Sequence, residues 1–75
     1  MKSKNISGMN IAKHRKKAGF TQLELSKRLK GSGTEIDRAG IAKIENGLRN
    51  VLDFELLAIS KVLKVDLDRL LRGKR

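Results

Sequence analysis

Apolar side chains recur three, four or seven residues apart along most of the 75-residue chain, with short polar breaks between the repeats. This spacing places them on one face of an α-helix, as for Leu56, Ile59 and Leu63. No stretch alternates apolar and polar residues with the two-residue period of a half-buried strand. The pattern predicts an all-α domain of five short helices around one small core.

Helix caps and glycines predict the helix bounds, because the chain has no proline. We expect a first helix from Gly8 to about Ala18. Thr21–Glu24 has the T-x-x-E form of a capping box and should open a second helix that continues through Leu29. The glycine-rich stretch 30–33 then predicts a loop.

The last two helices are predicted near the C-terminal end. One begins near Asp53 and continues to Leu63, and a shorter one follows Asp66, with three leucines expected to point inward: Leu67, Leu70 and Leu71. The predicted organisation is a flexible basic tail over residues 1–7, one helical domain over residues 8–71, and a second basic tail over residues 72–75.

The third predicted helix, within Ile36–Arg49 (IDRAGIAKIENGLR), has the most unusual surface. Asp37 is placed to cap its start, Ile41 and Ile44 share its inner face, and Asn46-Gly47 predicts its end. Its outward positions carry two cations, two very small residues and no acid: Arg38, Lys43, Ala39 and Gly40. Such a surface favours close approach to a polyanion, above all duplex DNA.

The charge balance favours a phosphate-rich partner. The chain carries 18 Lys and Arg against 8 Asp and Glu, a net charge of +10. Residues 1–30 hold nine of these cations and a single acid. Phe20 and Phe54 are the only aromatic residues, too few for the stacking platform of a single-strand binder, so double-stranded DNA is favoured. The alternative is a solvated basic surface that only aids solubility.

Several other functions lack the residues they need. The chain has no cysteine and one histidine, His14, which excludes disulfides and a multi-histidine metal site. We find no paired carboxylates, no nucleophile–base set and no P-loop, so we expect no enzyme activity, no cofactor and no metal. No apolar run is long enough for a membrane span or a signal peptide, and we expect a cytoplasmic protein without membrane association.

The segments Ile11–Leu29 (IAKHRKKAGFTQLELSKRL) and Ile36–Arg49 together resemble the Cro and phage-repressor class of helix-turn-helix regulators. Leu56–Leu71 is similar to the last two helices of that class. The resemblance covers about residues 8–71. It implies a five-helix, lambda-repressor-like domain in which helices two and three form the helix-turn-helix motif. It also implies a sequence-specific regulator of transcription, in most cases a repressor, that binds an inverted-repeat operator as a homodimer.

The resemblance further implies roles for individual residues. Arg38, Ala39 and Lys43 match positions that contact base edges, and Gln22 matches a phosphate-binding glutamine. Phosphate contacts are also implied after helix three, at Asn46, the Gly47–Leu48 backbone and Arg49. Arg15 and Glu45 match an ion pair that joins helix one to helix three. From the residues themselves, Gly40 either lets the helix lie deeper in the DNA groove or is simply tolerated by the fold.

The chain departs from its relatives at three places. Seven residues, Lys30–Ile36, separate Leu29 from Asp37, where relatives have a turn of three or four residues. Val51 stands where many relatives have proline, and His14 occupies a position that is usually apolar or small. The enlarged loop leaves the angle of helix three open.

Two other functions stay open beside the specific regulator. One is an antitoxin-type protein that binds a toxin partner as well as its own promoter, and the other is a non-specific cationic binder of nucleic acid. If the chain dimerises, we expect a modest contact surface formed by helix five and the C-terminal tail, with Leu23 and Leu48 as exposed apolar candidates.

Overall fold

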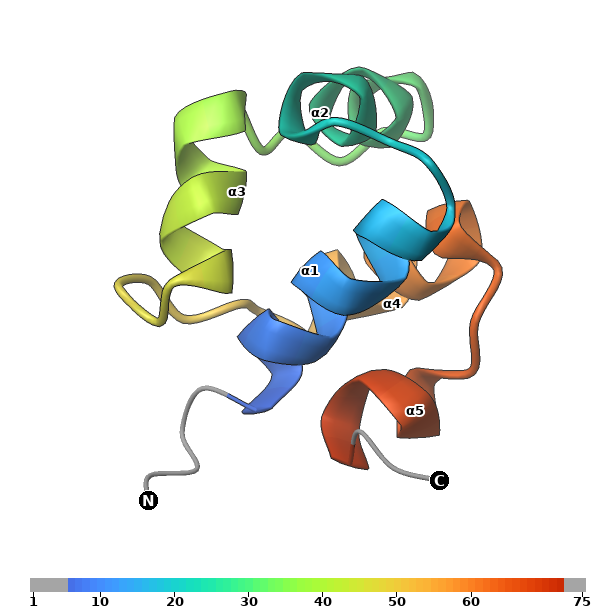
Figure 1. Ribbon diagram of the computed structural model, residues 1–75. Coiled ribbons are helices and arrows are strands. Elements are labelled where there is room, and N and C mark those ends of the chain that lie inside the picture. Colours follow the sequence, from blue (N-terminus) through green and yellow to red (C-terminus); the bar gives the residue numbers. More distant parts are fainter. Residues whose placement is uncertain (1–5, 73–75) are drawn as a thin grey trace.

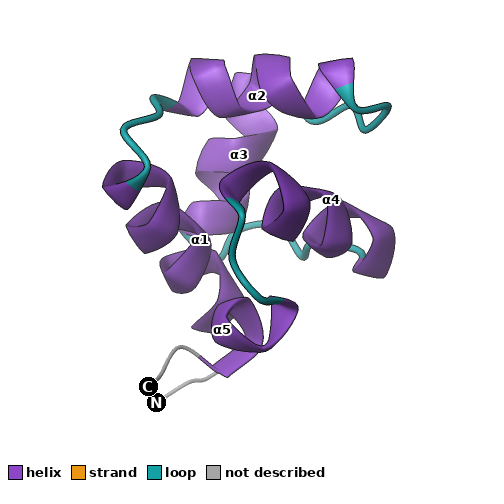
Figure 2. Cartoon of the chain, turned by 90° about the vertical axis from the view of Figure 1, so that its right-hand side faces the viewer, coloured by secondary structure: helices purple, strands orange, loops and turns teal. Residues whose placement is uncertain are grey.

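The computed structural model describes residues 6–72 and contains five helices, with no strand among those residues (Figure 1). The helices are α1 (Ile6–Lys17), α2 (Gln22–Gly31), α3 (Arg38–Glu45), α4 (Asp53–Leu63) and α5 (Leu67–Arg72). In the turned view α2 lies across the top, α1 and α4 lie below it, and α5 closes the bottom (Figure 2). The prediction of five helices is therefore confirmed.

A single core lies between the helices, and each helix contributes to it. Six side chains in it are essentially inaccessible to solvent, with at most 1% of their surface exposed: Ile11, Leu25, Leu29, Ile41, Ile59 and Leu70. Phe20 and Val51 from the connecting segments pack against this core. Burying each such side chain contributes about 1.5–3 kcal/mol relative to leaving it exposed, which is how so short a chain can hold α3 in a fixed place.

Glycine ends three of the helices in the same way. Gly19, Gly33 and Gly47 have φ between 77° and 96°, a left-handed conformation that glycine adopts without a Cβ penalty. After α3, the Gly47 amide donates to the Ile44 carbonyl and the next amide donates to the Lys43 carbonyl, the two bonds of a Schellman motif. At its start, Asp37 accepts a hydrogen bond of 2.8 Å from the Gly40 amide. The predicted bounds of α3 are thus confirmed.

Other predicted bounds differ from the structure. Helix α1 begins at Ile6, two residues earlier than expected, and α2 continues to Gly31 because Gly33, not Gly31, is the residue that ends it. Residues 1–5 and 73–75 of the predicted tails lie outside the described residues. In α5 the inward prediction holds for Leu70 alone, since Leu67 and Leu71 are 36% and 49% exposed. A helix of six residues packed on one side cannot bury three leucines.

The enlarged connection between α2 and α3 is fixed at both ends. At its start, the Thr34 amide donates to the Leu29 carbonyl across Gly33. At its end, the Ser26 hydroxyl donates to the Ile36 carbonyl at 2.8 Å, and the Ile36 side chain is buried in the core. The extra residues therefore add length on the surface, while α3 stays anchored to α2 by Ile36.

Candidate nucleic-acid interface

The outward face of α3 presents three side chains that the sequence predicted to contact bases. Arg38, Ala39 and Lys43 are all exposed, whereas Ile41, Ile44 and Glu45 are buried on the opposite side. The side chains of Arg38 and Lys43 make no hydrogen bond or ion pair with any residue that the structure describes. Both cations are therefore available to an external anion. Asn46, at the C-terminal cap, is also exposed.

The ion pair implied between helices one and three is present and buried. Arg15 Nε donates to Glu45 Oε2 at 2.7 Å and Nη2 donates to Glu45 Oε1 at 3.1 Å. The remaining guanidinium nitrogen, Nη1, donates to the Phe20 carbonyl at 2.7 Å. Two parallel bonds to one carboxylate fix orientation as well as distance, so this pair sets how α3 lies against α1.

Gln22 joins the same network, which the sequence did not reveal. Its side-chain Nε2 donates to Glu45 Oε1 at 3.0 Å, across 23 residues of sequence. Gln22 is half-buried at the first position of α2, and an amide NH₂ carries two hydrogens. One hydrogen is used by Glu45, and the second has no partner among the described residues at the N-terminus of α2. The resemblance paired Arg15 with Glu45 but gave no reason to add Gln22 to that pair.

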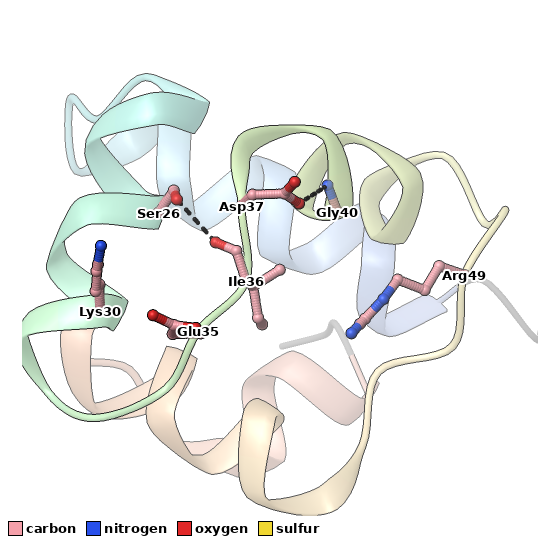
Figure 3. Close-up of a pocket in the computed structure, with 7 residues that line it drawn as sticks. All are labelled: Ser26, Lys30, Glu35, Ile36, Asp37, Gly40 and Arg49. Carbon is pink, nitrogen blue, oxygen red and sulfur yellow. Dashed lines mark hydrogen bonds between the residues drawn. The ribbon is translucent and has the colours of Figure 1, made fainter.

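The structure gives a reason for glycine at position 40 that neither interpretation of the sequence contained. A Cβ placed on Gly40 would lie 2.9 Å from Asp37 Oδ1 and 2.9 Å from Ile36 Cγ2. The first atom is the cap of α3 and the second belongs to a buried branched side chain, so neither yields easily. The close approach of these three residues is visible in Figure 3. The helix cap itself thus accounts for the glycine.

Arg49 is already paired within the protein. Its two terminal nitrogens donate to the two carboxylate oxygens of Glu55 at 3.0 and 2.9 Å, and Nη1 also donates to the Asn50 carbonyl. These bonds lower the pKa of the Glu55 carboxyl below its ordinary value, although burial opposes the shift. The phosphate contact predicted for Arg49 remains a prediction, and it would have to share this arginine with Glu55. Arg49 also borders an open hollow of about 430 Å³ beside Gly40 (Figure 3).

The C-terminal part of α1 is strongly basic. Lys13, Lys16 and Lys17 are exposed, while His14 between them is buried. Burial lowers the pKa of His14 below 6.5, and the charges of Lys17, Lys13 and Arg69 lower it further. His14 is therefore a neutral packing residue at neutral pH.

Within residues 6–72, no helix is long and apolar enough to cross a membrane.

The chain has the features of a helix-turn-helix DNA-binding domain. It contains five helices, α3 ends at a glycine and exposes a cationic face, and α2 is bonded to the inner side of α3.

A family model of the Cro/C1-type helix-turn-helix matches residues 11–70, and the chain belongs to that family. The fold is the lambda-repressor-like arrangement of five helices that the sequence predicted, and the protein is a DNA-binding regulator of transcription. No curated protein and no solved structure matches the chain.

Proposed function

We propose that this protein is a repressor that recognises an inverted-repeat operator in double-stranded DNA as a homodimer, with one α3 in the major groove of each half-site. The observation that carries the proposal is the outward face of α3, where two cations that have no partner among residues 6–72 flank a small side chain and no acid is exposed. Half-site centres would lie about 10–10.5 base pairs apart, or a multiple of that distance.

Each exposed residue of α3 has a distinct chemistry toward DNA. Arg38 fits two parallel bonds to O6 and N7 of guanine, a contact that discriminates by about 1–3 kcal/mol against the wrong base. The Ala39 methyl group suits the C5-methyl of thymine, and Lys43 reaches a base or a phosphate one turn further along. Gln22 offers its second amide hydrogen to a phosphate, where the N-terminus of α2 also favours negative charge.

Selection from a random duplex library at near-physiological salt tests the proposal. We expect an enriched inverted repeat for the natural protein. Arg38→Ala should relax the preference at one base position of each half-site, whereas Gln22→Ala should weaken all sequences about equally. Binding that depends on salt without any enrichment would instead indicate a non-specific cationic binder.

The repressor role needs a separate measurement. We expect transcription in a purified system to fall when the selected operator overlaps the promoter, and Arg38→Ala to reverse this effect. Increased transcription from the same template would make the protein an activator.

A further inference from the structure

The two arginine–glutamate pairs use different edges of the guanidinium group. An arginine carries five N–H groups in one plane, one on Nε and two on each terminal nitrogen. Arg15 bonds Glu45 through Nε and Nη2, and its Nη1 donates to the Phe20 carbonyl. Arg49 bonds Glu55 through Nη1 and Nη2 instead, the two nitrogens at the far end of the group. Glu55 therefore leaves the side edge of Arg49 unoccupied.

Two hydrogens of Arg49 remain on that side edge. Nη1 uses both of its hydrogens, since it donates to Glu55 and to the Asn50 carbonyl. Nη2 uses one of its two, and Nε makes no hydrogen bond with any residue that the structure describes. No buried side-chain nitrogen within residues 6–72 lacks a partner, so the unpaired Nε reaches solvent. The free hydrogens of Nε and Nη2 lie on one edge and form the fork that fits two oxygens of a phosphate.

Arg49 lies on the flank of α3 away from Gln22. Gln22 is bonded to Glu45, whereas Arg49 borders the open hollow of about 430 Å³ together with Asp37 and Gly40 (Figure 3). Positions 40 and 45 are about 140° apart around the helix axis, and the exposed face of α3 occupies the wider arc between them. A helix in the major groove has a phosphate strand on each side, so the two flanks face different strands.

Glu55 is a fixed support for Arg49. Its side chain is 5% exposed and lies in the first turn of α4, where Oε1 also accepts a bond of 2.9 Å from the Leu52 amide. The Arg49 side chain is 34% exposed and follows α3 on a loop. A free arginine loses side-chain entropy when it binds a phosphate, whereas an arginine already held by a carboxylate has less to lose.

Charge alone does not draw a phosphate to this flank. Two cations, Lys30 and Arg49, border the hollow. Two acids, Glu35 and Asp37, border it as well, and the Glu55 carboxylate adds a third. On charge alone, removing any one of these acids should strengthen binding to DNA. For Glu55, charge and position therefore predict opposite effects.

We propose that Glu55 is a positioning residue for DNA binding, which holds Arg49 so that its Nε–Nη2 edge bonds a phosphate on the flank of α3 away from Gln22. This role belongs to the interface of the proposed function and rests on that function. Arg49 keeps its bonds to Glu55 when DNA binds, because the two partners take different edges of one guanidinium group.

Fluorescence anisotropy of a labelled duplex, titrated with the full chain at fixed salt, tests this role. We expect Glu55→Gln to weaken binding about five- to tenfold although the chain gains positive charge, because the new amide presents hydrogens to Arg49 where the carboxylate accepted them. The remaining carbonyl oxygen can still accept from the Leu52 amide, so α4 should keep its start.

The matched control is Asp53→Asn. It removes an exposed acid from the same turn of α4 and should leave binding unchanged or slightly tighter. Equal or tighter binding by Glu55→Gln as well would overturn the proposal, because charge alone would then account for both variants.

A second background separates positioning from a structural role. In an Arg49→Met chain, Glu55→Gln should no longer weaken binding, since the arginine that it positions is gone, and the lost negative charge should tighten binding slightly. A loss of the same size in both backgrounds would assign Glu55 to the fold alone and also overturn the proposal.

The role of Glu55 can hold or fail independently of the proposed function. A phosphate contact acts on every sequence, so the loss should be about equal for the selected operator and for a duplex of scrambled sequence. A chain that selects no operator, but loses affinity for every duplex on Glu55→Gln, would refute the specific regulator and support this role. Operator selection together with unchanged binding by Glu55→Gln would do the reverse. A natural chain that binds no duplex would overturn both.

Discussion

On one flank of α3 the carboxylate of Glu45 is bonded to Arg15 of α1 and Gln22 of α2, residues that lie 30 and 23 positions away. On the other flank the bonds are local. Asp37 caps the amide of Gly40 three residues later, and Arg49 meets Glu55 six residues later beside an open hollow. The first flank joins three helices, whereas the second caps the start of α3 and joins the loop after α3 to the first turn of α4.

The two arginine–glutamate pairs also differ in exposure. The side chains of Arg15 and Glu45 are 9% and 6% exposed, whereas Arg49 is 34% exposed although Glu55 is only 5% exposed. Removing one member of a fully buried pair leaves an isolated charge without water. The two ion pairs have similar geometry but should contribute differently to the free energy of unfolding. Their burial and their separation in sequence account for the difference.

The largest effect is expected for Arg15→Met. This change leaves the Glu45 carboxylate buried with only Gln22 as a partner, and the free energy of unfolding should fall by about 3–5 kcal/mol. Urea denaturation of the variant measures it. The neighbouring Lys16→Met, an exposed change, serves as the control and should stay within about 0.5 kcal/mol. A loss below 1 kcal/mol for Arg15→Met would contradict the role given to this network.

Gly40→Ala probes the local flank. Alanine normally favours a helix interior over glycine by about 1 kcal/mol, but here its Cβ would meet Asp37 and Ile36. We expect a loss of about 1–3 kcal/mol through the displaced cap and the shifted core residue. The control is Gly31→Ala at the end of α2, where a Cβ has nothing within 4 Å and alanine should be neutral or stabilising. Equal effects of both variants, in urea denaturation, would refute the steric explanation.

Arg49→Met should cost less, about 1–2 kcal/mol, because the arginine is partly exposed and Glu55 keeps a bond from the Leu52 amide. Glu55 titrates below its ordinary pKa while paired, so its contribution to stability is present above pH 4.5 and disappears as the pH falls. The variant should lose part of this acid sensitivity. A double-mutant cycle with Glu55→Gln measures the coupling directly.

The smallest expected effect concerns pH and His14. Its pKa is lowered in the folded state, so below pH 6.5 the unfolded chain binds more protons than the folded one. The free energy of unfolding should therefore decrease as the pH falls from 6.5 toward the lowered pKa. His14→Gln should remove this slope in denaturation curves between pH 5 and about 7.5. An unchanged slope would assign it to the carboxylates instead.

The sequence predicted α3 to the residue because Asp37 and Gly47 mark its two ends and its buried isoleucines are correctly spaced. It misplaced the start of α1, which has no acid in its first turn to mark it. It also misplaced the end of α2, because Gly31 and Gly33 are equivalent as sequence signals and only the backbone conformation separates them.

The candidate site was predictable where one helix supplies its residues. Arg38, Ala39 and Lys43 follow from the period of a single helix. The bond between Gln22 and Glu45 depends on how two helices pack, and the steric need for Gly40 depends on the rotamer of the preceding Ile36. The pairing of Arg49 with Glu55 reflects the path of a loop. These contacts are tertiary, and no local pattern encodes them.

The Glu45 network has a consequence for the energetics of recognition. Releasing α3 while the remaining helices stay folded would strand a buried guanidinium and a buried carboxylate, so partial opening of this region is unfavourable. Under the proposed function, α3 would therefore meet DNA already folded and fixed against α1 and α2. Association through Arg38 and Lys43 would then cost conformational entropy mainly in those two side chains, with little loss from the backbone.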